Sequence, residues 1–425
     1  MGKKTALIVV FATTLAPGAP AGSTVVIGTG NPDVDVPAVQ AAVDLGGKVV
    51  LSGRFSFNAA PEIPAPLRAL GFPPATILIS KAVAISGAGD AIIERGTIPF
   101  YVDAPRAAVS IENVHFVRPS KNAIFVYSVK GLVISSCHIE GFVPLPNIQF
   151  SGVGISTGDM GVIPTPSQPG HPENISGRIL IAKNDLDLVG GKESDAVLGI
   201  TAFSAGQAPG GEVDLYISQN RIRNVNRPGI DLRRIGGSAY VEGNRIITSS
   251  VASQATAEVI RVVNVGSFVI AHNVIDCQWS NPDAIGMGVY SQVAEWPIVN
   301  ALVVDNEITM SPPRGVQFTN FSAGIDIRGF AKNIFVGSNS IRGRARAAVA
   351  AEVFRGGIPA NTAFVLNRLD DFDASVAGVI VGSGVSDTFI LGPQGTLNDQ
   401  GINTVISALG GGPDPRNRAS ERRKK

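Results

Sequence analysis

A short phrase ending in asparagine recurs along the chain and restricts the folds that the chain can adopt. It consists of three apolar residues, a turn of two or three residues that ends in Asn, any residue, and then Ile or Leu. Its asparagines are Asn184, Asn220, Asn244, Asn273, Asn306, Asn339 and Asn367. Their spacing varies between 24 and 36 residues. A fixed phrase at variable spacing predicts a coil with constant strands and loops of different length.

Two earlier segments extend the pattern. VSIENVHF contains Asn113, and VISSCHI has Cys137 where Asn is expected. Asn tolerates the left-handed conformation of a sharp corner, and its amide can bond to the Asn of the coils above and below. We therefore predict an all-β chain forming a single-stranded right-handed parallel β-helix (a solenoid) of roughly eleven coils. Leucine-rich repeats are the alternative, but their LxxLxL spacing is missing.

A helix is expected before the first coil. Val36, Val39 and Val43 would share one face of it, which fits a short N-terminal capping helix over an otherwise open core. Asp33 or Asp35 can cap its start, and a Gly pair at 46–47 ends it.

The two ends of the chain differ from the body. Residues 1–21 combine Lys3 and Lys4, an apolar stretch and an Ala-Pro-Ala site, which predicts a signal peptide, although a buried first strand is the alternative. Residues 22–409 would form the β-helix domain, and 410–425 a disordered basic tail. No other segment is long and apolar enough to span a membrane, so we expect a secreted or periplasmic protein.

Composition narrows the partners. Charged residues make up only 16% of the chain, and the formal net charge of +1 comes from the two ends, which leaves the body acidic. An acidic body disfavours nucleic acid as a partner. Cys137 and Cys277 would lie about four coils apart, too far for a disulfide, so we predict two free thiols in a monomer.

Three segments carry a resemblance to a known family. DVPAVQAAVDLGGKVVLSGRFSF (35–57), ISKAVAISGAG (79–89) and the Asn phrases resemble the pectin lyase-like superfamily of right-handed β-helix proteins. That superfamily includes pectate lyases, polygalacturonases, epimerases, phage tailspikes and passive surface proteins, so the resemblance implies a fold and leaves the activity open. The polygalacturonase branch is disfavoured, because Asn361-Thr362 is followed by Ala363 and there is no Gly-His-Gly. Pectate lyases of this fold combine acidic calcium ligands with a catalytic Arg, but no segment matches closely enough to transfer residues.

Alternation along the strands predicts a charged outward strip. In GIDLR and GIDIR the apolar residues point inward, so their Asp and Arg point outward. The strip would consist of Asp231, Arg233, Arg261, Asp326, Arg328 and Glu352. It suits an acidic polysaccharide, because Arg binds carboxylates and an Arg of lowered pKa could abstract the proton beside one.

The sequence thus predicts an exported protein that binds or cleaves an acidic polysaccharide, by lyase-type β-elimination if it is catalytic. Arg233 or Arg261 would be the base and Arg328 would neutralise the substrate carboxylate, with Asp231 and Asp326 as ligands. One alternative is a non-catalytic structural, adhesive or carbohydrate-binding protein with solvated charges. The other is a glycoside hydrolase using Asp326 and Glu352, expected about 5 Å apart on adjacent coils.

Two further groups complete the candidate sites. Trp279 and Trp296, with Tyr290 between them, could stack on a sugar ring or cover the end of a strand. The insertion 144–174 could form a groove wall or decorate its coil.

Metal sites have weaker support in the sequence. Asp370, Asp371 and Asp373 could bind calcium, the only cofactor that the sequence suggests, or form a solvated turn. The four His residues fall in separate repeats, which argues against a His-based metal site.

Overall fold

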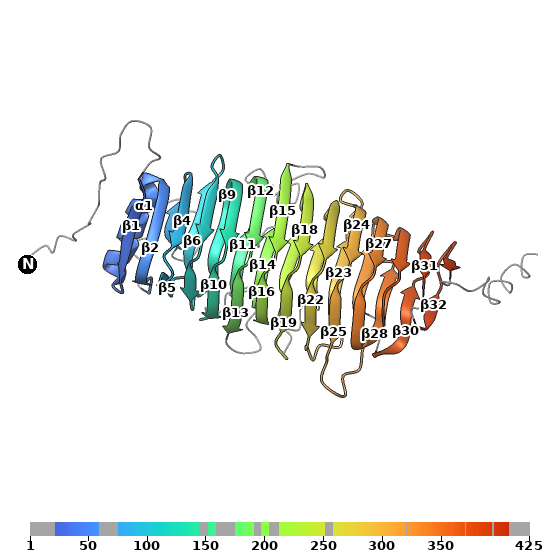
Figure 1. Cartoon of the computed structure of the whole chain (residues 1–425). Helices are drawn as coiled ribbons and strands as arrows, with labels where there is room; N and C mark the ends of the chain where they lie inside the picture. Colours follow the sequence, from blue (N-terminus) through green and yellow to red (C-terminus); the bar gives the residue numbers. More distant parts are fainter. Residues whose placement is uncertain are drawn as a thin grey trace, which may run out of the picture. The chain divides into compact units, whose positions relative to one another are not determined.

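The chain folds as a right-handed parallel β-helix, as predicted. The computed structural model describes residues 22–58, 75–143, 152–158, 175–190, 197–203, 212–250, 258–319, 321–369, 371–392 and 395–407. Contacts group the chain into two compact units, unit 1 (Met1–Val225) and unit 2 (Asn226–Lys425). In each unit, strands one coil apart pair in parallel and form three ladders, seen as successive arrows in Figure 1.

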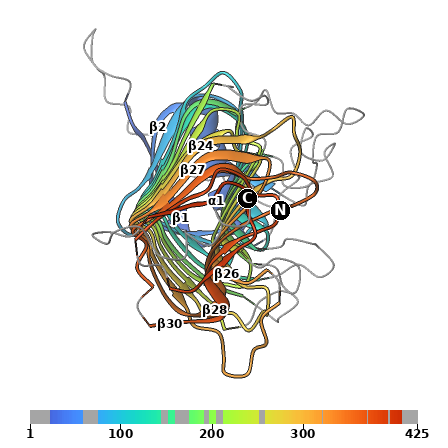
Figure 2. The ribbon, with the colours of Figure 1, turned by 90° about the vertical axis from the view of Figure 1, so that its right-hand side faces the viewer.

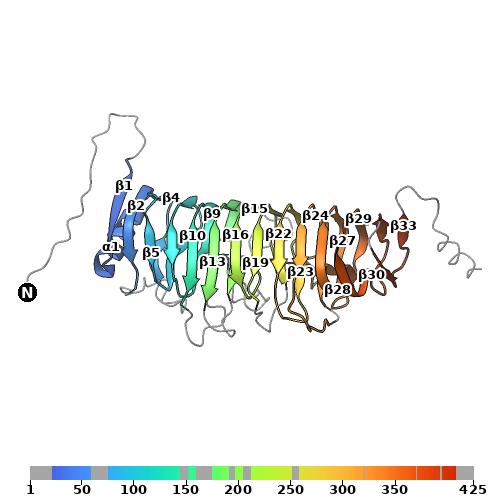
Figure 3. The same ribbon diagram turned by 60° about the horizontal axis from the view of Figure 1, so that its bottom comes forward.

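The three ladders of unit 1 follow the same order in each coil. The first contains β1 (Thr24–Thr29), β2 (Gly47–Ser56), β4 (Val83–Gly87), β7 (Val109–Glu112), the end of β9 (Asn122–Ser135), β12 (Ile175–Ala182) and β15 (Val213–Ser218). The second contains the end of β2, β5 (Ile92–Glu94), β8 (His115–Val117), β10 (His138–Phe142), β13 (Asp185–Gly190) and β16 (Arg221–Val225), several of which are seen side by side in Figure 3. The third contains β3 (Ala75–Ile79), β6 (Ile98–Ala104), the start of β9, β11 (Val153–Thr157) and β14 (Leu198–Phe203).

Unit 2 repeats this plan. Its first ladder contains β18 (Ser238–Glu242), β21 (Ser267–Ala271), β24 (Ile298–Val304), β27 (Ala331–Gly337), β29 (Ala360–Val365), β31 (Phe389–Leu391) and β33 (Val405–Ser407). Its second contains β19 (Arg245–Thr248), β22 (Val274–Cys277), β25 (Glu307–Met310) and the start of β28 (Ser340–Glu352). Its third contains β17 (Ile230–Arg233), β20 (Glu258–Val263), β23 (Ile285–Ser291), β26 (Ala323–Gly329), the end of β28, β30 (Phe372–Val381) and β32 (Leu397–Asp399). Figure 2 shows β24 and β27 across the coil from β26 and β28.

The predicted capping helix is confirmed as α1 (Pro32–Leu45), which packs against β1, β2 and β3. Its apolar face buries Val36, Val39, Ala42 and Val43. The predicted cap was wrong, because the side chain of Asn31 accepts the hydrogen bond from the Asp33 N–H, at 3.1 Å. An N-cap oxygen of this kind satisfies one of the unpaired donors at a helix start.

Asp35 has a different role from the one predicted. Its buried carboxylate accepts hydrogen bonds from the backbone N–H of Thr29 at 2.7 Å and from the Thr29 hydroxyl at 2.8 Å. It also accepts one from the backbone N–H of Ser56, at 2.8 Å. One carboxylate therefore ties the helix to the first two strands of unit 1.

Buried asparagines form a continuous stack in unit 2, as predicted. The Nδ2 of each Asn donates to the Oδ1 of the Asn on the next coil, at 2.9–3.0 Å, and each backbone N–H donates to the same oxygen. The members are Asn244, Asn273, Asn306, Asn339 and Asn367. In unit 1, Asn184 donates to Asn220 in the same way, and Cys137 N–H donates to Asn184 Oδ1 at 2.9 Å.

The left-handed corner residue is not the asparagine, which corrects the predicted mechanism. Positive φ angles occur one position earlier, for example 55° at His272 and 53° at Asp305. Asn113 has a φ of 56° and occupies this earlier position, so Val114 aligns with Cys137 in the stack. The asparagines are selected for their amides, because a buried amide can satisfy several backbone groups at once.

Both cysteines are free, as predicted, and both are buried. Burial raises the pKa of the Cys137 and Cys277 thiols to about 12, so both stay protonated at neutral pH. The predicted signal peptide (1–21), the tail (410–425) and most of the insertion 144–174 lie outside the described residues. Among the described residues, no helix is long and apolar enough to cross a membrane.

The asparagine stack yields a testable stability difference. Asn306→Ala should lower the free energy of unfolding by about 2–4 kcal/mol, because the Asn273 donors and the Ile270 and Val304 carbonyls lose buried partners. Chemical denaturation would measure this loss. Asn333→Gly is the control: the exposed amide bridges Asn300 and Asn361, at 3.1 Å each, glycine tolerates the φ of 57° at this position, and loss of the amide should cost less. Equal losses in the two variants would contradict the role assigned to the buried stack.

Candidate functional site

The third ladder of unit 2 places the predicted charged residues on one face. One row of register partners runs Asp231, Arg261, Gly288, Asp326 and Ala350. The neighbouring row runs Arg233, Val263, Tyr290, Arg328 and Glu352. This register places Asp231 and Asp326 three coils apart.

Four of the six residues are buried, whereas the sequence predicts an exposed strip; the side chains of Arg233 and Glu352 are 32% and 22% exposed. Asp231 and Asp326 are both 0% exposed, Arg261 is 6% exposed and Arg328 is 4% exposed. The guanidinium of Arg328 lies 4.5 Å from the ring centroid of Phe321, which precedes β26. Alternation correctly separates inward from outward residues, but it does not show whether other side chains cover the outer face.

Two arginines neutralise Asp231. Its carboxylate accepts hydrogen bonds from Nε and Nη2 of Arg261, the first at 2.9 Å, and from Nε and Nη2 of Arg233, both at 3.1 Å. Burial alone would raise the pKa of Asp231, but the two guanidinium groups outweigh it and lower that pKa. Burial would likewise lower the pKa of Arg261, but Asp231 reverses the effect and raises it. A raised pKa argues against Arg261 as a base.

The surroundings of Asp326 shift its pKa in the opposite direction from that of Asp231. It has an ion pair with Arg328, but neither of its carboxylate oxygens has a hydrogen bond of good geometry. Burial therefore raises the pKa of Asp326 to about 7; Arg328 opposes this shift, and the negative charge of Glu352 adds to it. Asp326 is a buried carboxyl group whose protonation changes near neutral pH.

Glu352 is not placed as the hydrolase alternative requires. The register pairs it with Arg328, and Asp326 with Ala350, so the sequence alignment of the two acids was wrong by two residues. Glu352 accepts hydrogen bonds from Arg346 at 2.6 and 3.1 Å and from Arg328 at 3.4 Å. Because Arg328 contacts both acids, the two carboxylates belong to one ion-pair network.

The predicted aromatic platform is not assembled. Trp279 is 0% exposed and cannot stack on a sugar from solvent. Trp296 is half-buried and follows β23, whereas Trp279 precedes that strand, so they do not share a corner of the coil. Tyr290 packs with Val263 and Ile285 in a buried cluster, and the Tyr290 hydroxyl lies where a side chain at Gly288 would collide with it.

The predicted calcium site is only partly described. Asp370 lies outside the described residues, and Asp371 and Asp373 are both exposed. Exposed carboxylates bind calcium only when several oxygens converge. Calcium binding at this turn stays a prediction.

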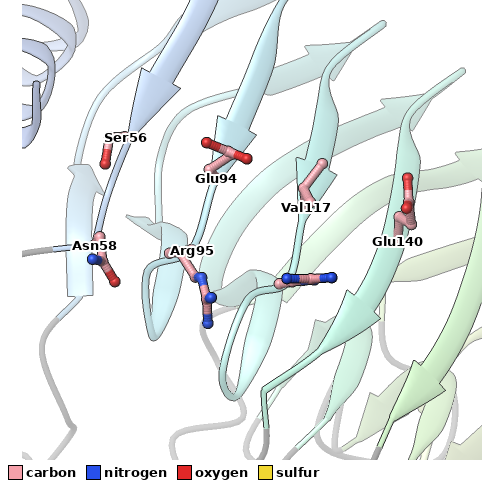
Figure 4. Close-up of a pocket in the computed structure, with 7 residues that line it drawn as sticks. Ser56, Asn58, Glu94, Arg95, Val117 and Glu140 are labelled. Carbon is pink, nitrogen blue, oxygen red and sulfur yellow. The ribbon is translucent and has the colours of Figure 1, made fainter. Parts of the chain in front are cut away.

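Unit 1 contains a charged cleft that the sequence interpretation missed. Its volume is about 410 Å³ and it opens over the second ladder (Figure 4). Four lining residues are register partners on successive coils: Ser56, Glu94, Val117 and Glu140. The other lining residues are Asn58, Arg95 and Arg118.

The two arginines of this cleft follow from local backbone geometry. Arg95 and Arg118 come directly after β5 and β8 in left-handed conformations, with φ of 68° and 53°. Each backbone N–H donates to the next coil, to Val117 O and Glu140 O, both at 2.8 Å. The sequence signal was an Arg at the end of two successive short runs, IIER and HFVR.

The comparisons define the fold class. The chain matches no protein-family model and no curated protein sequence. Among solved structures it is similar to PfbA, a surface adhesin of Streptococcus pneumoniae, at 14% identity and a TM-score of 0.51, over 90% of this chain and 91% of that one. A PL6 alginate lyase in complex with a trisaccharide is 14% identical, with a TM-score of 0.40, over 89% and 86% of the two chains. Endo-xylogalacturonan hydrolase from Aspergillus tubingensis is 11% identical, with a TM-score of 0.37, over 91% and 100%.

The similarity to PfbA supports the architecture seen in the structure. The protein has a parallel β-helix fold like that of PfbA, which is the fold that the resemblance found in the sequence implies. A fold by itself does not define an activity.

The contrast between Asp326 and Asp231 can be tested by pH-dependent stability. The folded pKa of Asp326, about 7, exceeds its ordinary value of 3.8, so the folded protein binds this proton more tightly than the unfolded chain. The contribution of Asp326 to the free energy of unfolding therefore decreases as the pH rises from about 4 to 7. Asp326→Asn should raise it by about 1–3 kcal/mol at pH 8 and by much less at pH 5, measured by urea unfolding.

Asp231→Asn is the matched control. The pKa of Asp231 is lowered, so its charged form stabilises the fold, and the Asn variant should be less stable than the wild type at pH 8. The same loss of stability in both variants at pH 8 would refute the electrostatic difference between the two sites.

Proposed function

We propose that the protein binds a linear acidic polysaccharide along the second ladder of unit 1, with the charged cleft as its central subsite. The observation that carries this proposal is the pair Arg95 and Arg118 beside an open cleft of about 410 Å³. Guanidinium groups bind carboxylates through two parallel hydrogen bonds. Glu94 and Glu140 add acceptors for sugar hydroxyls.

The repeat of the coil supports a polymeric ligand. Successive coils are about 4.8 Å apart, close to the length of one sugar residue in an extended chain. Arg95 and Arg118 occupy equivalent positions on adjacent coils, so neighbouring uronate residues could each meet one guanidinium group. Val117 lies between Glu94 and Glu140 and would offer an apolar surface to a ring.

The charges of unit 2 favour binding over cleavage. Elimination by Arg261 would need a lowered pKa, and Asp231 raises it. Hydrolysis would need two accessible carboxyl groups, and Asp326 is wholly buried. We therefore propose the carbohydrate-binding or adhesive alternative and assign the ion pairs of unit 2 a structural role.

The proposed ligand fits the predicted export. A polysaccharide of this kind lies outside the cytoplasm, where a chain with a cleaved signal peptide at 1–21 would meet it. PfbA, which shares the fold, is a surface adhesin. Secretion, like the monomeric state, is part of this proposal.

Binding to immobilised polygalacturonate and alginate tests the proposal. The full-length protein should bind one of them more tightly than neutral dextran, and added salt should weaken that binding. Arg95→Ala together with Arg118→Ala should weaken it by about 10-fold or more, since each charged hydrogen bond contributes about 1.5–3 kcal/mol.

Arg245→Ala provides the control, because Arg245 is an exposed arginine of the second ladder in unit 2. Unchanged affinity in the double variant would refute the cleft as the binding site. Absorbance of unsaturated uronates and counts of reducing ends on the same samples would detect cleavage, and either signal would overturn the non-catalytic assignment.

A further inference from the structure

Two histidines meet on the second ladder of unit 1. His115 on β8 and His138 on β10 are register partners, and their ring centroids are 4.4 Å apart. The expectation that separate repeats keep the histidines apart was wrong for this pair. In a parallel coil, equivalent positions of successive repeats become neighbours.

A carboxylate completes the group. Glu140 follows His138 by two residues and therefore points to the same side of the strand. Its Oε2 lies 3.2 Å from Nε2 of His115 and 3.7 Å from Nε2 of His138. The three potential ligand atoms all lie within 4.8 Å of one another, and among the described residues this is the only such group of three His, Cys, Asp or Glu side chains.

Asp185 supports the group from the next coil. It is the register partner of His138, and its Oδ2 lies 3.6 Å from Nδ1 of that ring. A carboxylate behind the distal nitrogen of an imidazole fixes the ring orientation and is typical of metal-ligating histidines. Arg223 in turn contacts Asp185, at 3.2 Å.

The donor set indicates the kind of ion. Two imidazole nitrogens and one carboxylate oxygen suit zinc and similar divalent transition metals, whereas calcium and magnesium prefer oxygen ligands alone. The side chains of His115, His138 and Glu140 are 29%, 34% and 56% exposed, which leaves access for an ion and for a fourth ligand from solvent.

We propose that His115, His138 and Glu140 bind a divalent transition metal, zinc being the best fit, with Asp185 as the positioning residue for His138. Small rotations of these partly exposed side chains would bring the donors to the 2.0–2.2 Å or so that zinc requires. The proposal does not depend on polysaccharide binding. Glu140 also lines the charged cleft, so a bound ion would lie at the edge of that cleft.

Zinc titration of the full-length protein, prepared without a histidine tag and stripped with a chelator, tests the site. Competition with a chromophoric chelator should show one high-affinity zinc per chain, undisturbed by millimolar calcium. His115→Ala and His138→Ala should each weaken binding by more than about 100-fold, and Asp185→Asn by about 10–100-fold, the usual effect of an outer-shell partner.

Two controls keep the result interpretable. His272→Ala removes an exposed imidazole of unit 2 and should leave zinc affinity unchanged. His115→Gln and thermal unfolding of each variant separate loss of a ligand from loss of the fold, and zinc should raise the Tm of the wild type but not of the His115 variants.

Equal zinc affinity in the wild type and in the His115 and His138 variants would overturn the proposal, as would displacement of zinc by calcium. Because no polysaccharide is present in the titration, a negative result leaves the proposed polysaccharide binding to be judged separately.

Discussion

In-register parallel pairing is the constraint on which the rest of this structure depends. Each residue lies one strand spacing from the equivalent residue of the next coil. Its side chain must therefore pack against the side chains at the same position in the coils before and after it. Asn306 meets Asn339, Asp231 meets Arg261, and His115 meets His138. A buried amide, an ion pair and a group of metal donors thus arise from one geometric rule, and they differ only in which residue types occupy the row.

Much of the fold could be predicted because the repeated phrase encodes it directly. The coil, the capping helix and the two free thiols all follow from spacing and from the inward apolar residues. The conformation of the corner was harder to predict. The asparagine recurs in the sequence, but the left-handed residue before it differs between coils; His272, Asp305 and Ser338 are examples. The repeated Asn was therefore assigned the left-handed φ angle, which belongs to the residue before it, whereas its own role is to form the buried hydrogen bonds.

The candidate sites were less accessible to sequence interpretation for two physical reasons. Loop lengths differ from coil to coil, so the partner of a residue depends on the register, and Glu352 was aligned with Asp326 although it pairs with Arg328. Burial of an outer face depends on residues from other segments, such as Phe321 over Arg328. The charged cleft and the histidine pair likewise arise from rows across coils, and a row is visible only once the register is known.

The asparagine stack has a direction as well as a position. In unit 2 the side-chain amides of Asn244, Asn273, Asn306 and Asn339 each donate to the Oδ1 of the Asn on the following coil, and the row ends at Asn367. Four amide–amide hydrogen bonds therefore run in the same direction along the row, while the second N–H of the inner amides donates to a backbone carbonyl of the preceding coil. Hydrogen bonds in such a row polarise one another, so the middle members gain more than the end members. The interior of unit 2 thus contains a row of side-chain hydrogen bonds that all run in one direction, in a fold whose backbone hydrogen bonds run between neighbouring strands.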